Sequence, residues 1–95
     1  MTDRQQSLDI LNATHAFPAP VMFKVIGENN ETFVARVVAA VREELIAVED
    51  PPYTTRAARN GRHISITLEP HMSDAEQVLA VYDRLRTLPG VLMLM

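Results

Sequence analysis

The sequence predicts an α+β protein, folded as a two-layer ferredoxin-like βαββαβ sandwich. Strand and helix patterns follow one another in that order: strand patterns at 21–26, 53–58, 62–69 and 91–95, and helix patterns at 31–46 and 74–88. Asn60-Gly61 separates the two middle strand patterns, as expected for a β-hairpin with a type I′ turn. The chain has 95 residues, which suits one domain. We therefore expect a four-stranded antiparallel sheet of order 4-1-3-2, with two helices on one face.

The first strand has two distinguishable faces. Alternation places Val21, Phe23 and Val25 on one face and Met22, Lys24 and Ile26 on the other. The lysine indicates that its face is open to water. Gly27 is expected to end the strand, and Asn29 or Asn30 to cap the following helix. The apolar stripe of that helix consists of Phe33, Val34, Val37, Val38, Val41 and Leu45.

The second half of the chain repeats the scheme. Flanking prolines place the strand at 53–58 at a sheet edge. The next strand alternates, with Ile64, Ile66 and Leu68 directed inward. Ser73 and Glu76 have the spacing of a capping box for the second helix, with Ser73 as N-cap.

Residues 1–16 read as a partly ordered lead-in to a single domain at 17–95. Leu8 and Leu11 allow one helical turn at most, packed on the domain edge. The first twelve residues lack the apolar region of a signal peptide, and no apolar run is long enough to span a bilayer, so we expect a cytoplasmic protein without membrane contact. The sequence has no cysteine, which excludes disulfides and thiolate metal sites.

Three segments resemble the YbeD-like bacterial proteins, a family of unknown function: Phe17-Pro18-Ala19-Pro20, Phe23-Lys24-Val25-Ile26-Gly27 and Ser65-Ile66-Thr67. The resemblance runs from about residue 11 to residue 95. It implies a βαββαβ fold similar to the ACT-type regulatory domains, and by analogy a regulatory or small-ligand role. The chain departs from the family at Asn60-Gly61-Arg62-His63, where members commonly carry an aromatic residue. The family implies no catalytic residues.

Several activities that share this fold lack their residues here. A heavy-metal carrier needs a CxxC motif after the first strand, and an acylphosphatase-like enzyme needs an arginine in that loop, but 27–30 contains neither. An RNA-recognition motif needs exposed aromatic residues on its central strands, and the strand at 62–69 has none. His63 and His71 do not have the spacing of a known metal site, so we predict neither metal nor cofactor.

The loop Gly27, Glu28, Asn29 and Asn30 is the candidate ligand site, with Lys24 nearby on the open face. A helix N-terminus offers unpaired N–H groups to an anion such as a metabolite carboxylate. The ordinary interpretation of the same residues is a glycine turn followed by an asparagine cap.

The C-terminal run is the candidate interface. Simple alternation places Val91, Met93 and Met95 on one face and Leu92 and Leu94 on the other. Because helices cover one face only, the other should expose an apolar patch beside the first strand, suited to self-association or a protein partner. The candidate interface residues are Met22, Ile26, Leu92, Met93, Leu94 and Met95.

Together these features predict a non-catalytic regulatory or adaptor domain that binds a small metabolite or a protein partner. One alternative is a small enzyme that uses Lys24 and His63 on the open sheet face. Another is a single-strand nucleic-acid binder that uses Arg56, Arg59 and Arg62 around the hairpin, although the net charge of −3 makes nucleic acid a poor partner.

Overall fold

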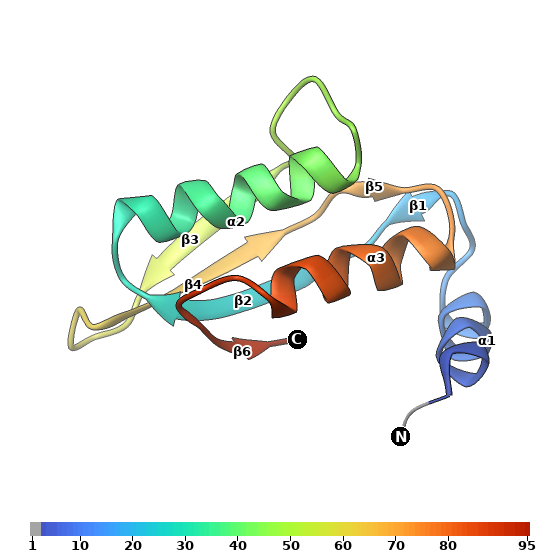
Figure 1. Cartoon of the computed structure of the whole chain (residues 1–95), viewed down its shortest axis with the longest axis horizontal. Helices are drawn as coiled ribbons and strands as arrows, with labels where there is room; N and C mark the ends of the chain where they lie inside the picture. The colour runs from blue at the N-terminus through green and yellow to red at the C-terminus, as the bar shows by residue number, and fades with distance from the viewer. Residues whose placement is uncertain (1–2) are drawn as a thin grey trace.

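The computed structural model describes residues 3–95 and contains helices and strands in mixed order (Figure 1). Along the chain these elements are α1 (Arg4–Thr14), β1 (Ala19–Pro20), β2 (Phe23–Glu28), α2 (Glu31–Glu44), β3 (Tyr53–Ala57), β4 (His63–Leu68), β5 (His71–Met72), α3 (Ala75–Arg86) and β6 (Val91–Leu94). The first two residues of the predicted lead-in lie outside the described residues.

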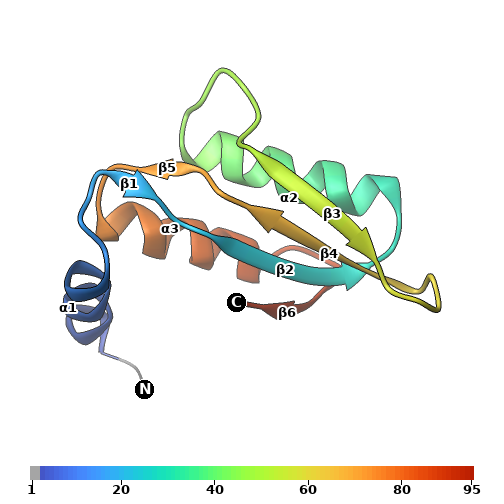
Figure 2. The ribbon, with the colours of Figure 1, turned by 180° about the vertical axis from the view of Figure 1, so that it is seen from behind.

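The four-stranded sheet has the order β3-β4-β2-β6, and all neighbouring strands are antiparallel. The helices α2 and α3 lie side by side on one face of this sheet (Figure 1), and no helix of residues 3–95 covers the opposite face (Figure 2). The predicted α+β class is therefore confirmed. The full length of the helix α1 and a second small sheet of β1 and β5 were not predicted.

The hydrophobic core fills the space between the sheet and the two helices. Alternation along β2 and β4 directs Phe23 and Val25, and then Ile64, Ile66 and Leu68, toward the helices. The helices pack their buried residues against these side chains: Phe33, Val37, Val38, Ala40 and Val41 from α2, and Ala75, Val78, Val81 and Leu85 from α3. Each large side chain buried in this way stabilises the fold by roughly 1.5–3 kcal/mol relative to an exposed one.

The helix caps agree with the sequence at α2 and differ at α3. Asn30 is the N-cap of α2, and its side chain accepts a hydrogen bond of 2.6 Å from the Phe33 N–H. At α3 the predicted capping box is shifted by one residue, because Asp74 rather than Ser73 is the N-cap and accepts from the Gln77 N–H at 2.8 Å. Both residue types are good caps, so the sequence did not distinguish between them.

Two turn predictions were wrong in detail. Gly27 lies inside β2, which runs to Glu28, and does not end it. The β3–β4 hairpin exists, but of the pair Asn60-Gly61 only Gly61 has positive φ (74°), and the Gly61 N–H donates to the carbonyl of Ala58 at 2.9 Å. That bond makes a type I turn followed by a left-handed glycine, rather than the expected type I′ turn.

The helix α1 is longer than the single turn that the sequence suggested. Its N-cap is Asp3, whose carboxylate accepts from the Gln5 N–H at 3.0 Å. It packs against α3, where Arg4 pairs with Glu76 at 2.8 Å and Leu11 lies against the core. None of its residues is fully buried, which explains why it has no strong apolar stripe.

Within residues 3–95, no helix is both long enough and apolar enough to cross a bilayer.

Candidate functional site

The face of the sheet that no helix covers presents side chains from all four strands. Residues paired directly across antiparallel strands point to the same face. Lys24 pairs with Thr67, Ile26 with Ser65 and Glu28 with His63 between β2 and β4. On β3, Thr54 and Arg56 continue the first two of these rows. The open face therefore presents its side chains in rows across the strands, and it changes from apolar next to β6 to basic next to β3.

The side of this face next to β6 is apolar. Met93 pairs with Ile26, and Met95 lies opposite Lys24, since the two residues exchange backbone hydrogen bonds of 2.8 and 2.9 Å. Met22, Met93 and Met95 each expose half or more of their surface, at 58%, 52% and 51%. We call Met22, Ile26, Met93 and Met95 the apolar half of the open face.

A bulge in the pairing of β2 with β6 corrects the predicted alternation of the last strand. Val25 pairs with Leu94 and Ile26 with Met93, but Gly27 pairs with Val91, so Leu92 is the extra residue. Val91 and Leu94 both pack against the core, although the simple alternation had placed them on opposite faces. Leu94 therefore faces the core rather than the open face on which the interface was predicted. Leu92 remains strongly exposed, at 62%.

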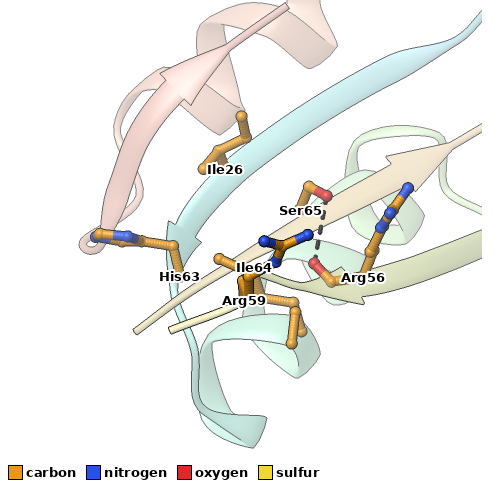
Figure 3. Close-up of a pocket in the computed structure, with 8 residues that line it drawn as sticks. Ile26, Arg56, Arg59, His63, Ile64 and Ser65 are labelled. Atoms are coloured by element: carbon orange, nitrogen blue, oxygen red, sulfur yellow. Dashed lines mark hydrogen bonds between the residues drawn. The ribbon is translucent and has the colours of Figure 1, made fainter. Parts of the chain in front are cut away.

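The side of the open face next to β3 is basic and hollowed. A shallow hollow of about 440 Å³ is lined by Ile26, Arg56, Arg59, His63 and Ser65, with Ala57, Ala58 and Ile64 (Figure 3). Ser65 donates a long hydrogen bond of 3.4 Å to the backbone carbonyl of Arg56, which links β4 to β3 across this hollow. We call Arg56, Arg59, His63 and Ser65 the basic half.

The cations of this region have no carboxylate partner, unlike most of those elsewhere in residues 3–95. Arg4, Arg42, Arg84 and Arg86 all form ion pairs with acidic side chains. Within residues 3–95, Lys24, Arg56, Arg59 and Arg62 form none. Arg36 on α2 also lacks a carboxylate partner and donates instead to the Pro89 carbonyl at 3.1 Å. The other four uncompensated positive charges lie on the open face or in the hairpin of a chain whose net charge is −3.

The predicted ligand loop is engaged within the protein. The Asn30 side chain caps α2, and the Asn29 side chain donates to the carbonyl of Gly61 at 2.9 Å, which ties the loop to the hairpin. Gly27 sits against the ring of Phe33 and the backbone of Gly90, so close that a β-carbon would overlap both. Glu28 is exposed and pairs with His63 on β4. Lys24 lies earlier on β2, where it pairs with Thr67. Lys24 therefore lies away from Gly27, Asn29 and Asn30, the loop residues that contact α2 or the hairpin.

The two histidines singled out in the sequence lie apart. His63 begins β4, whereas His71 belongs to β5, beyond the other end of β4. In the part of the chain that the structure describes, no three His, Cys, Asp or Glu side chains are grouped closely enough to hold a metal ion.

Tyr82 is a titratable residue that the sequence did not mark. It lies on α3, near β6, with its ring 4.8 Å from that of Phe23 and tilted by 60°. Partial burial disfavours the phenolate, and this desolvation raises the pKa of Tyr82 above its ordinary value.

Comparison with known proteins places the chain in a family. The family described as "Protein of unknown function (DUF493)" matches residues 12–95. Similar proteins named "UPF0250 protein" occur in Shewanella piezotolerans (36% identical over 75 residues), Shewanella loihica (35%) and Shewanella oneidensis (32%). Each match covers 79% of this chain and 83% of the relative. The chain belongs to this family, and the predicted kinship with small bacterial proteins of unknown function is confirmed.

Proposed function

We propose that this chain is a non-catalytic adaptor or regulatory domain of the cytoplasm, which binds a protein partner through the apolar half of its open sheet face. We further propose that the four-stranded sheet with α2 and α3 is a ferredoxin-like domain of the ACT type. The strand order β6-β2-β4-β3 and the placement of both helices on one face support this assignment.

The observation that carries the proposal is the exposure of Met22, Met93 and Met95 on a face that no helix covers. Large apolar side chains grouped in this way on a surface are typical of interaction sites. Methionine suits such a site because its flexible, polarisable side chain adapts to different partner surfaces.

The register of the sheet supports a binding role over the enzymatic alternative. Lys24 pairs with Thr67 whereas His63 pairs with Glu28, so the two proposed catalytic groups are four residues apart along the strands. At about 3.3 Å per residue the separation is roughly 13 Å, far beyond a hydrogen bond. A base and its partner in general acid–base catalysis need to lie within hydrogen-bonding reach.

A small carboxylate metabolite at 27–30 is the weaker form of the binding proposal. Asn29 and Asn30 already have partners within the protein, at Gly61 and Phe33. A ligand there would compete with the helix cap, whereas a partner on the open face would displace only water.

The test compares two exposed apolar residues changed in the same way. Met93→Glu places a charge in the apolar half, and Val48→Glu places one on the loop between α2 and β3, where Val48 is 98% exposed. Proteins captured by the wild type and by Val48→Glu, but not by folded Met93→Glu, support the proposal. Light scattering over a concentration series tests whether the partner is a second copy. If Met93→Glu keeps every captured protein and the wild type stays monomeric, the apolar half is not an interface.

A further inference from the structure

We infer that the outer edge of β3 binds an extended protein segment whose side chains alternate between acidic and apolar, and adds it to the sheet as a further strand. This surface is distinct from the apolar half, because β3 and β6 are opposite edges of the four-stranded sheet. The inference therefore stands or fails separately from the proposed function.

The backbone of β3 is paired on one side only. The Ala58 N–H donates to the His63 carbonyl at 2.7 Å, and the Glu69 N–H donates to the Pro52 carbonyl at 2.9 Å. In an antiparallel ladder such residues alternate, so Thr54 and Arg56 also direct their backbone groups toward β4. Tyr53, Thr55 and Ala57 then direct N–H and C=O outward. Every residue of β3 is exposed, so an incoming strand can reach these groups.

Two surfaces of different chemistry flank this edge. On the helix side, the surface of a groove between α2 and β3 is mostly apolar. It is lined by Val34, Ala35, Tyr53 and Ile64, together with Asn29, Asn30, Glu31 and Thr55. On the open side lies the basic half, with Arg56 beside β4 (Figure 3). Successive side chains of a strand point to opposite faces, so a strand added here would direct alternate residues into the apolar groove and toward the arginines.

Charge complementarity selects acidic residues for the open side. Arg56 and Arg59 form no ion pair within residues 3–95, so a partner carboxylate would not have to displace an internal one. Exposed ion pairs contribute little affinity, about 0–1 kcal/mol each. We therefore assign affinity mainly to the main-chain hydrogen bonds, and selection of the acidic pattern to the arginines.

The same geometry favours a peptide over single-stranded nucleic acid. Outward N–H and C=O groups at regular strand spacing match another peptide backbone. Single-strand nucleic-acid sites combine positive charge with aromatic platforms for the bases. Tyr53, the aromatic residue of β3, shares the helix side of the sheet with Thr55, away from Arg56.

A proline at an outward-facing position of β3 distinguishes strand addition, which needs the backbone N–H, from non-specific binding, which does not. Thr55→Pro removes an N–H that makes no ladder bond within the protein, so the sheet should survive, while Thr55→Ala keeps that N–H. The probe is a monomeric, end-blocked nonapeptide of alternating Glu and Val, titrated by fluorescence anisotropy. We expect Thr55→Pro to weaken binding at least tenfold and Thr55→Ala to leave it unchanged. Arg56→Gln with Arg59→Gln should weaken it several-fold and reduce its salt dependence.

Four results would overturn the inference: no binding of the Glu–Val peptide at millimolar concentration, equal binding of a Lys–Val peptide, full binding by folded Thr55→Pro, or tighter binding of a single-stranded oligonucleotide of equal charge. Should Thr55→Pro fail to fold, amide exchange of the wild type decides the matter. Peptide must then slow exchange at Tyr53, Thr55 and Ala57. Met93→Glu should leave peptide binding unchanged, which keeps this surface separate from the apolar half.

Discussion

The two edge strands of the sheet are built in opposite ways. On β6, a bulge turns both Val91 and Leu94 toward the core, and the strand closes the core beside Tyr82. On β3, all five residues are exposed, and the strand is held mainly by its ladder to β4. The β6 edge therefore contributes side chains to the core, whereas the β3 edge leaves its outer backbone groups accessible to the peptide that we propose. Mutations should separate the two: changes to the core-facing residues of β6 alter unfolding, and changes to the outer edge of β3 alter peptide binding.

The largest effect is expected where β2 meets β6. In Gly27→Val the new β-carbon would overlap the ring of Phe33 and lie 2.5 Å from the Gly90 carbonyl oxygen. The backbone oxygen cannot move without disturbing the turn into β6, so we expect a loss of about 3 kcal/mol or more in the free energy of unfolding. Urea denaturation followed by circular dichroism measures it.

The matched control introduces a valine on the edge strand β3. Ala57 is exposed on β3, so Ala57→Val should change stability by less than about 0.5 kcal/mol. If the two valines cost the same, the contrast between the edges is wrong.

A second pair of variants tests the bulge itself. Leu94 lies against the core and Met93 on the open face, although they are neighbours in β6. Leu94→Ala should cost about 1–2 kcal/mol, less than a fully buried leucine because Leu94 is only half-buried. Met93→Ala should cost less than about 0.5 kcal/mol. If Met93→Ala lowered the free energy of unfolding more than Leu94→Ala in the same denaturation experiment, the strand would pair without the bulge.

The difference between β4 and β6 shows when a sequence pattern determines the face that each side chain occupies. The strand β4 was predicted correctly because polar residues alternate with Ile64, Ile66 and Leu68, which fixes the face that each side chain occupies. The run at β6 has no polar residue, so nothing in it distinguishes regular alternation from a bulge. Asn29 or Asn30 was predicted as the cap of α2 because both precede the helix pattern at 31–46, and the structure selects Asn30. The helix α1 has no strong apolar stripe: Leu8 and Leu11 indicated one turn, and its full length is signalled weakly, by Asp3 and by the absence of Gly and Pro up to Pro18.

The candidate site likewise has features that the sequence predicted and features that it did not. Lys24 in an otherwise apolar strand indicated correctly that one face of the sheet is open to water. The groove beside β3 was not predicted, because it depends on where α2 comes to rest relative to the edge of the sheet. Likewise, the arginines of the hairpin are visible in the sequence, but their lack of carboxylate partners is a property of the folded surface.

The loop that leads into β3 provides a third, smaller test. Ile46 follows α2 with φ of 51°, its N–H donates to the Glu43 carbonyl and the Ala47 N–H to the Arg42 carbonyl, as in a Schellman motif. Glycine is the usual residue at this left-handed position, because a β-branched side chain is crowded there. Ile46 is 91% exposed, so its removal costs little packing. Ile46→Gly should raise the free energy of unfolding by about 0.5–1 kcal/mol, while Ile46→Val, which stays β-branched, should not. A destabilised Ile46→Gly in thermal melts would contradict this.

The smallest effect is a pH dependence confined to the β6 side. Desolvation raises the pKa of Tyr82 in the folded protein, so between the unfolded pKa, about 10, and the higher folded pKa the native state binds more protons than the unfolded state. Its contribution to stability is therefore complete below pH 10 and is lost as the pH rises through the folded pKa. Tyr82→Phe should remove that part of the alkaline loss and leave the edge strand β6 packed, since the ring contact with Phe23 remains. Unfolding midpoints of the two proteins from pH 8 to 11 provide the measurement. Parallel declines would mean that Tyr82 ionises as freely in the native protein as in the unfolded chain.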